Sequence, residues 1–175
     1  MPLSTEDRQR YVRAARREKF TIAVKNARKV AVVESLLKKH EGAPTLILGT
    51  YLDQLEWVAR RLRVPLITGK TPGPERREIF DRFRRGEIAV LALSRVGNFA
   101  IDLPSASVAI QIAGTWGSRQ EEAQRLGRVL RLKGGANEAW FYTVVTADSR
   151  EQEFAERRQL FLTEQGYPYR IEAAS

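Results

Sequence analysis

The sequence contains no cysteine and a single histidine, His40, and these two shortages exclude several kinds of site. A chain without cysteine has neither a disulfide framework nor a thiolate-bound metal. One histidine also argues against a metal centre built from histidines, so we expect no bound metal. No apolar run approaches the ~20 residues that span a bilayer, and the amino terminus, "MPLSTEDRQR", lacks the apolar core of a signal peptide. These absences indicate a cytoplasmic protein without membrane association.

What the sequence does contain is an excess of positive charge. Its 175 residues are 43% hydrophobic and 29% charged, which is typical of one folded domain with at most a short appendage. The formal net charge of +9 predicts attraction to polyanions, with nucleic acid first and acidic membrane or protein surfaces behind it. Arginine outnumbers lysine. Two explanations fit this bias equally well. One is genomic base composition, and the other is the binding of phosphates by guanidinium groups.

The pattern of apolar residues predicts alternating strands and helices. Ser4 begins a helix that leads into a very basic segment, so we assign residues 1–25 to a basic helix or linker and 26–175 to the main domain. Asn26 is expected to cap the next helix. Further helices are expected over "LDQLEWVARRL", "PERREIFDRF" and from Ser118 and Ser149. Short apolar strands are expected at 45–49, 65–69, 88–93, 108–113 and 139–145.

Strands that are apolar on both faces and alternate with helices predict an α/β fold with a parallel sheet covered on both sides. In such a sheet, ligands gather at the carboxyl ends of the strands. Those ends carry polar and small residues that we take as site candidates: Thr50, Thr68, Gly69, Lys70, Ser94 and Arg95.

Gly69-Lys70-Thr71 has the letters that end an ATP-binding P-loop, but the spacing is wrong. A P-loop needs a glycine five positions before the Gly-Lys pair, and that position is Val64. Proline at positions 72 and 74 also removes amide donors that a phosphate cradle requires. We therefore predict that this chain has no ATP cradle of its own.

The stretch "SRQEEAQRLGRVLR" (118–131) is the strongest functional signal. Ser118 and Glu121 form a capping box at the start of a helix. At about 100° per residue, Gln124, Arg128 and Arg131 lie within roughly 60° of one another, opposite an apolar stripe. A glycine at position 127, beside them, costs about 1 kcal/mol relative to alanine in a helix. That cost is tolerable if a ligand must approach the backbone closely there. Arginine spacing by itself also fits a solvated basic face.

The complete pattern Gln-Arg-x-Gly-Arg-x-x-Arg resembles motif VI of superfamily 2 helicases. The resemblance implies that Arg128 and Arg131 are arginine fingers, catalytic groups that reach the γ-phosphate of an ATP held by another domain, and that Gln124 and Gly127 contact that nucleotide. A rigid guanidinium stabilises the charge of phosphoryl transfer without giving up a proton.

The segments upstream agree with that resemblance. "ALSRVGNFAIDLPSASVAIQIAG" resembles motif V, which implies that Ser94 and Arg95 meet a nucleic-acid phosphate and that Asp102 contacts the ribose of ATP. "LILGTY" resembles motif IV and contains Thr50. "ITGKTPGPERREIFDRFRRGE" is similar to the family segment in which Thr68 and Gly69 face the nucleic acid. Lys70 is either a phosphate contact or a solvated lysine.

The region from about Phe20 to Ile171 resembles the XPB family of DNA helicases, most specifically from Trp140 through "RRQLFLTEQGY". The resemblance implies a RecA-like three-layer α/β/α domain with a mostly parallel central sheet, the second motor domain of an ATP-dependent 3′–5′ DNA helicase or translocase of repair or transcription. The first RecA-like domain, which would hold most of the ATP and Mg²⁺, lies outside this sequence. We therefore interpret the chain as a C-terminal piece of a longer protein.

The partners implied are DNA, the first RecA-like domain and, for the whole protein, repair nucleases or transcription-repair factors. The implied location is the prokaryotic nucleoid or, in a eukaryote, the nucleus. Two alternatives stay open at this point. One is a related superfamily 2 motor that acts on RNA or on duplex DNA without unwinding, and the other is a non-catalytic nucleic-acid-binding module with a RecA-like fold.

Overall fold

The computed structural model describes residues 1–94, 106–113, 138–164, 166 and 168–173. Five strands form one sheet in the order β2-β3-β1-β4-β5, and every described pair is parallel. Their bounds are β1 Thr45–Gly49, β2 Leu66–Ile67, β3 Val90–Ser94, β4 Val108–Gln111 and β5 Trp140–Thr143. The parallel sheet predicted from apolar strands is confirmed.

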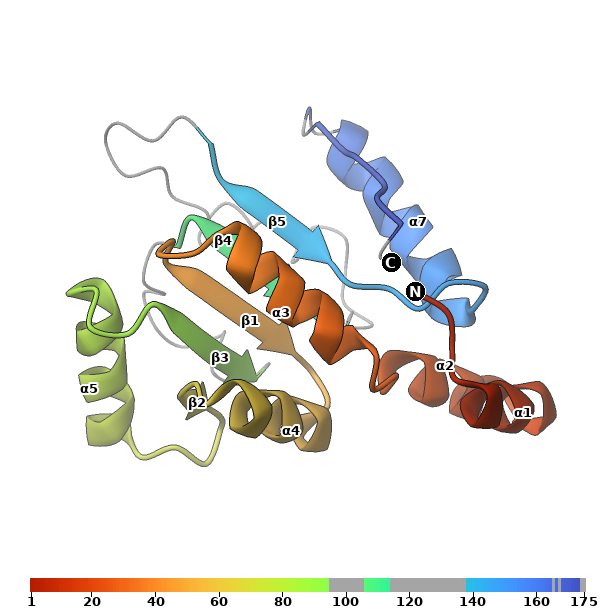
Figure 1. The fold of residues 1–175 in the computed structure, drawn as a ribbon, viewed down its shortest axis with the longest axis horizontal. Coiled ribbons are helices and arrows are strands. Elements are labelled where there is room, and N and C mark those ends of the chain that lie inside the picture. Colours follow the sequence, from red (N-terminus) through yellow and green to blue (C-terminus); the bar gives the residue numbers. More distant parts are fainter. Residues whose placement is uncertain (95–105, 114–137, 165, 167, 174–175) are drawn as a thin grey trace.

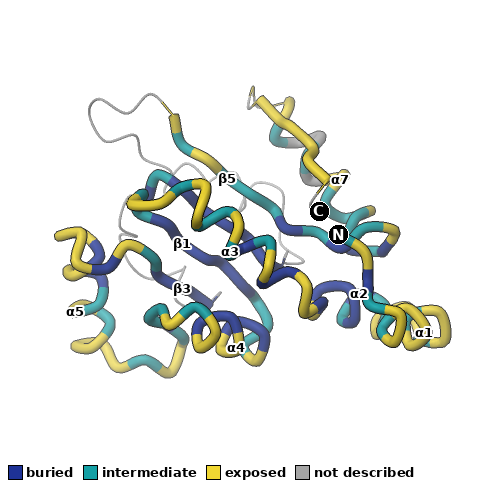
Figure 2. Tube along the Cα trace, in the orientation of Figure 1, coloured by how far each residue is buried: buried dark blue, intermediate teal, exposed yellow. Residues whose placement is uncertain are grey.

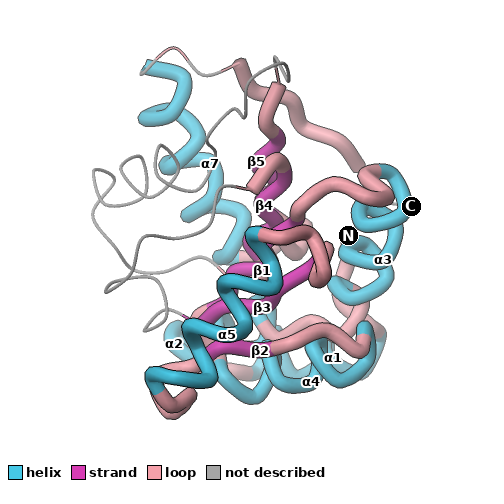
Figure 3. The backbone as a smooth tube through the Cα atoms, turned by 90° about the vertical axis from the view of Figure 1, so that its left-hand side faces the viewer, coloured by secondary structure: helices cyan, strands magenta, loops and turns pink. Residues whose placement is uncertain are grey.

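Helices cover both faces of this sheet (Figure 1, Figure 3). The described helices are α1 Thr5–Arg13, α2 Arg16–Val24, α3 Lys29–Lys39, α4 Leu52–Leu62, α5 Gly73–Arg84 and α7 Arg150–Glu164. Among these described residues, no helix is long and apolar enough to cross a membrane.

The alternation of side chains along β1 explains the two layers of core. Ile47 points into the cluster that α3 and α4 cover with Val33 and Val58. Its neighbour Leu46 points into the opposite cluster, which α5 covers with Phe80. All five residues of β1 are buried, as expected for the central strand of a covered parallel sheet, and Figure 2 shows this buried centre.

The amino-terminal part departs in detail from the expected pattern. Ser4 caps α1 as predicted, with its hydroxyl accepting from the amide of Asp7 at 3.1 Å. A second helix, α2, follows and buries its last turn. Asn26 does not cap α3 directly, because α3 begins three residues later. Its side-chain oxygen accepts from the amide of Arg28 at 3.1 Å and orders the turn before the helix. The domain boundary at residue 25 stays a prediction.

The second strand is shorter than expected. The pattern predicted residues 65–69, whereas β2 contains only Leu66 and Ile67. Thr68 N donates to Thr71 Oγ1 at 2.9 Å, and the chain turns away from the sheet there. This turn ends the strand because the amide that would continue the ladder is bonded locally.

Candidate nucleic-acid interface at the carboxyl edge

The carboxyl ends of β1, β2 and β3 bring the predicted polar residues to one edge of the sheet. In the parallel register Gly49 lies opposite Ser94. Ile67 lies opposite Leu93, so Thr68 follows beside Ser94. Residues that are 26 and more positions apart in the sequence thus become neighbours at this edge, as the strand pattern predicted for a ligand site.

Gly49 leaves room for side chains from α4 and from the segment after β4. A Cβ atom on Gly49 would lie 3.1 Å from Leu55 Cδ1 and 3.3 Å from Ile112 Cγ1. Those contacts are tighter than ordinary van der Waals packing, so the side chain of Leu55 or Ile112 would have to shift to make room for a larger residue. The glycine therefore lets these two side chains pack closely at the edge.

Two hydroxyl groups at this edge are buried without a hydrogen-bond partner among the described residues. They are Thr50 Oγ1, directly after β1, and Ser94 Oγ, the last residue of β3. Ser94 is only 6% exposed. A buried hydroxyl without a partner costs about 1–3 kcal/mol, so each such group needs an explanation, such as an ordered water or a ligand. Both were predicted as nucleic-acid contacts.

The turn after β2 has the wrong hydrogen bonding for a phosphate cradle. Besides the Thr68 amide, Lys70 N donates to Thr68 Oγ1 at 3.1 Å, and Thr71 N donates to Thr68 O at 3.2 Å. A P-loop keeps its amides free to surround phosphate oxygens. Because these three amides are bonded within the turn, the structure agrees with the spacing argument that Gly69-Lys70-Thr71 is not a P-loop.

The same turn presents Gly69 and Lys70 to solvent. Lys70 forms no ion pair with a described residue. Arg76 Nη2, on α5, donates to Thr71 O at 2.9 Å and fixes the turn against the helix. Arg76 was not singled out from the sequence, and only the arginine-rich composition of its helix hinted at it.

The end of α2 and the start of α4 are joined beside Thr50. Lys25 Nζ donates to Asp53 Oδ2 and lies 5.4 Å from the centre of the Tyr51 ring. The hydrogen bond from Lys25 lowers the pKa of Asp53, and the Gln54 amide contributes in the same direction. Gln54 Nε2 also donates to Val24 O at 2.7 Å. Sequence reasoning missed this cluster because its partners lie about 28 positions apart.

A buried ion pair holds the carboxyl end of β4. Lys29 Nζ donates to Glu151 Oε1 at 2.5 Å and to Ile112 O at 2.8 Å. Glu151 Oε2 accepts from the amide of Thr146 at 3.0 Å. Lys29 and Glu151 are each 1% exposed. The pair therefore connects α3, α7 and the segment that leaves β4, and nothing in the local sequence pattern indicated it.

The remaining predicted site residues lie outside the described residues. These are Arg95, Asp102, Gln124, Gly127, Arg128 and Arg131. Their roles stay predictions.

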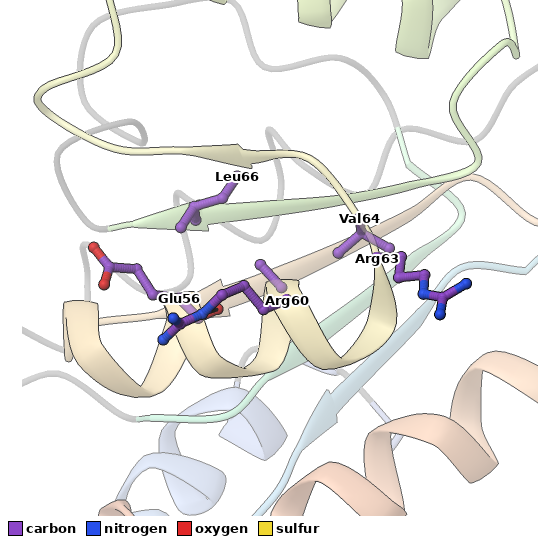
Figure 4. Close-up of a pocket in the computed structure, with 6 residues that line it drawn as sticks. Glu56, Arg60, Arg63, Val64 and Leu66 are labelled. Carbon is purple, nitrogen blue, oxygen red and sulfur yellow. Dashed lines mark hydrogen bonds between the residues drawn. The ribbon is translucent and has the colours of Figure 1, made fainter.

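An open groove of about 420 Å³ lies elsewhere, between α4 and β2 (Figure 4). No predicted site residue lines it. Its lining residues are Glu56, Ala59, Arg60, Arg63, Val64 and Leu66. The groove is therefore separate from the edge that carries Thr50 and Ser94.

Comparison with known proteins shows the family to which the chain belongs. A family model described as ERCC3/RAD25/XPB C-terminal helicase matches residues 1–175. The chain is 53% identical over 169 residues to the DNA 3′-5′ helicase XPB of Kineococcus radiotolerans, covering 97% of this chain and 30% of that protein. The corresponding protein of Mycobacterium tuberculosis is 50% identical, with 98% and 31% covered.

A eukaryotic relative is the Saccharomyces cerevisiae general transcription and DNA repair factor IIH helicase/translocase subunit XPB/SSL2. It is 36% identical over 97% of this chain and 21% of that protein. The chain therefore spans less than a third of the length of these relatives.

Solved structures support the fold. The C-terminal domain of the DEAD-box protein Dbp5 aligns with a TM-score of 0.67 at 19% identity, covering 79% of this chain and 80% of that one. The C-terminal part of the Fun30 ATPase domain aligns with a TM-score of 0.59 at 26% identity, covering 73% and 44%. The fold is that of a RecA-like helicase C-terminal domain, and this chain belongs to the ERCC3/RAD25/XPB C-terminal helicase family.

Proposed function

We propose that this chain is the second motor domain of an ATP-dependent 3′–5′ DNA helicase or translocase that acts in DNA repair or transcription. Family membership and the names of the relatives support this proposal. The single observation that carries it is the pair of buried hydroxyls, Thr50 Oγ1 and Ser94 Oγ, which lack partners among the described residues at the carboxyl edge.

The edge suits a nucleic-acid backbone. Hydroxyl groups donate hydrogen bonds to phosphate oxygens, and such contacts position a strand without reading its sequence. Thr50, Thr68 and Ser94 offer hydroxyls from adjacent strands, while Gly69 and Lys70 are exposed in the turn beside them. Lys70 adds a positive charge near this path. Arg95, directly after Ser94, is assigned to the same contact.

We assign the nucleotide side of the motor to Asp102 and to the segment 118–131. Arg128 and Arg131 stabilise negative charge on the γ-phosphate, Gln124 and Gly127 contact the nucleotide, and Asp102 accepts from the ribose. Hydrolysis of Mg²⁺-bound ATP supplies the free energy for movement. The bonded amides of the 68–71 turn do not fit a triphosphate. We therefore assign the main ATP and Mg²⁺ site to the first RecA-like domain.

The proposal is tested in the complete protein by separating DNA binding from hydrolysis. Ser94→Ala is expected to weaken DNA binding about tenfold, since a hydrogen bond to a charged group contributes about 1.5 kcal/mol. Arg128→Ala or Arg131→Ala is expected to abolish most ATP hydrolysis while DNA affinity stays unchanged. Unchanged turnover in both arginine variants would contradict the assignment of the arginine fingers.

The choice of DNA over RNA needs a matched assay. The complete protein is expected to hydrolyse ATP faster on a DNA strand than on an RNA strand of the same sequence. Equal or greater stimulation by RNA would favour a related RNA motor. The name of the yeast relative includes a transcription and repair factor, and we propose that the complete protein works with partners of that kind, in a nucleoid or a nucleus.

A further inference from the structure

The helical hairpin of α1 and α2 lies beyond the carboxyl ends of the strands (Figure 1). Phe20 and Val24 of α2 pack with Ala113, after β4, and with Tyr51, after β1. Gln54 and Lys25 add the polar contacts between α2 and α4 described above. The hairpin is therefore attached to the same edge that carries Thr50 and Ser94.

The amino-terminal end of the hairpin is also held in place. Leu3 is 7% exposed, and Asn26 Nδ2 donates to Pro2 O at 3.1 Å. Tyr11 OH accepts from the amide of Arg150, at the start of α7, at 2.9 Å. These contacts fix α1 relative to the domain, although α1 buries none of its own residues and is mostly exposed in Figure 2.

Four arginines of this hairpin are exposed and lack an ion-pair partner among the described residues. They are Arg8, Arg13, Arg16 and Arg17, which we call the arginine surface. Arg10, by contrast, lies 3.6 Å from an oxygen of Asp7. The hairpin also carries Glu6 and Glu18, which form no ion pair with a described residue, so its four free arginines outnumber its two free carboxylates and the excess attracts a polyanion.

Four other arginines, on α4 and at the end of α5, are neutralised locally. Arg61, Arg82, Arg84 and Arg85 each have a carboxylate oxygen between 2.5 and 3.5 Å away. The positive charge of the protein is thus free at α1 and α2 and compensated at these positions. Exposed arginines without an ion pair among the described residues also occur elsewhere, at Arg28, Arg60, Arg63, Arg77 and Arg157, but the hairpin gathers four such groups between positions 8 and 17.

The aromatic residues of the hairpin narrow the choice of polyanion. Single-stranded nucleic acid is usually bound by stacking bases on exposed rings. Phe20 is 5% exposed, and the Tyr11 ring is half-buried with Lys19 Nζ 5.7 Å from its centre. Neither ring is presented to a base. Guanidinium groups without a stacking platform suit the regular phosphate backbone of a duplex.

We propose that the arginine surface binds the phosphate backbone of duplex DNA, next to the strand-binding edge. This inference rests on the proposed function, because it takes DNA as the substrate. It adds a second contact that the motor motifs do not contain. Each guanidinium–phosphate contact releases condensed counterions, so the contact is measurable as salt dependence.

The test compares two variants of the complete protein that lose the same charge. The first is Arg8→Gln/Arg13→Gln/Arg16→Gln/Arg17→Gln, and the matched control is Arg61→Gln/Arg82→Gln/Arg84→Gln/Arg85→Gln. Binding to a fluorescein-labelled 20-base-pair duplex is measured by anisotropy between about 50 and 300 mM NaCl. Thermal unfolding of both variants checks that they are folded.

The first variant is expected to reduce the slope of log Kd against log salt by about 3 to 4, at about 0.9 per phosphate contact. Its duplex affinity at 100 mM NaCl is expected to fall at least tenfold, and the control is expected to change the slope by less than about 1. A variant with lysine at the same four positions is expected to retain most of the slope, because the slope depends mainly on the number of positive charges that contact phosphates.

Three results would overturn the proposal. One is an equal effect of the two charge-matched variants, which would indicate that total charge, and not its position, determines the duplex affinity. Another is an equal loss of affinity for duplex and for a 20-nucleotide single strand. The third is a loss of binding to vesicles of anionic lipid with duplex binding unchanged. Ser94→Ala in the same assay separates failure of this surface from failure of the proposed function, because the two sites share no residue.

Discussion

At the scale of single residues, Lys29 shows how a polar side chain stabilises an apolar core. Its ammonium group contacts a carboxylate from α7 and a carbonyl that follows β4, both far away in the sequence. A buried charge is tolerated only when its partner and its hydrogen bonds are present. Lys29 therefore adds polar contacts from α3 to α7 and to the segment after β4.

Removing one member of the Lys29–Glu151 pair should lower the free energy of unfolding more than removing both members does. Lys29→Met leaves Glu151 buried without its cation, and we expect the free energy of unfolding to fall by about 3–5 kcal/mol. Lys29→Met/Glu151→Met is expected to cost less than either single change. Urea unfolding of the three variants measures these differences. A double variant as unstable as the sum of the singles would contradict the coupling.

His40 is the second residue with a measurable consequence. It follows α3, and its Nε2 atom lies 2.6 Å from Tyr142 OH. Burial lowers the pKa of His40 below its ordinary value of 6.5, and the nearby charge of Lys39 adds to this. The unfolded chain thus takes up a proton at a higher pH than the folded chain does.

The sign of the pH effect follows from that difference. The contribution of His40 to stability is complete above pH 6.5 and is lost as the pH falls from there toward the folded-state pKa. We expect the urea midpoint of the wild-type protein to fall more than that of His40→Gln between pH 7 and pH 5. Because the sequence contains one histidine, parallel midpoints in the two proteins would show that His40 is not the group responsible.

At the scale of elements, α4 ends without the glycine that usually closes a helix. Arg63 has φ 55° and ψ 42°, in the left-handed region. Val64 N donates to Ala59 O at 3.0 Å, and Arg63 N donates to Arg60 O at 3.3 Å. This pair of hydrogen bonds is the Schellman motif, in which glycine is the favoured residue at the position of Arg63.

Arg63→Gly is therefore expected to stabilise the protein by about 0.5–1 kcal/mol, because glycine adopts this conformation without strain. Arg60→Gly is the matched control, since it removes the same charge from a right-handed helical position in the last turn of the same helix. That change is expected to destabilise the protein by about 1 kcal/mol, because glycine is less favourable than other residues within a helix. The urea midpoints should move in opposite directions, and a shared decrease would disprove the strain at Arg63.

The elements also show which local patterns are reliable in this sequence. The central strand and α4 begin and end where the apolar period predicted. The second strand and the start of α3 differ, because Thr68 and Asn26 form hydrogen bonds with backbone amides a few residues away. The end of α2 was missed as a buried element because Phe20 and Val24 pack on residues from distant strands.

At the scale of the whole molecule, the chain has a proposed DNA-facing edge, and its described residues form no ATP cradle. We expect the purified 175-residue chain to release no phosphate from ATP above background, with or without DNA. The bonded amides of the 68–71 turn and the missing P-loop glycine are the physical reasons. The complete protein with DNA is the positive control. DNA-stimulated turnover by the isolated chain would refute the prediction.

The sequence by itself determined the parallel α/β class, the strands that are buried on both faces and the polar residues at their ends. Those features are encoded locally, in the period of apolar side chains and in the residue that follows each strand. Only the tertiary structure decided the strand order, the pairing of Lys29 with Glu151 and the attachment of α2 beside Thr50. Such contacts join groups up to 122 positions apart, and the partner of a buried polar group depends on how the layers pack, which no local period specifies.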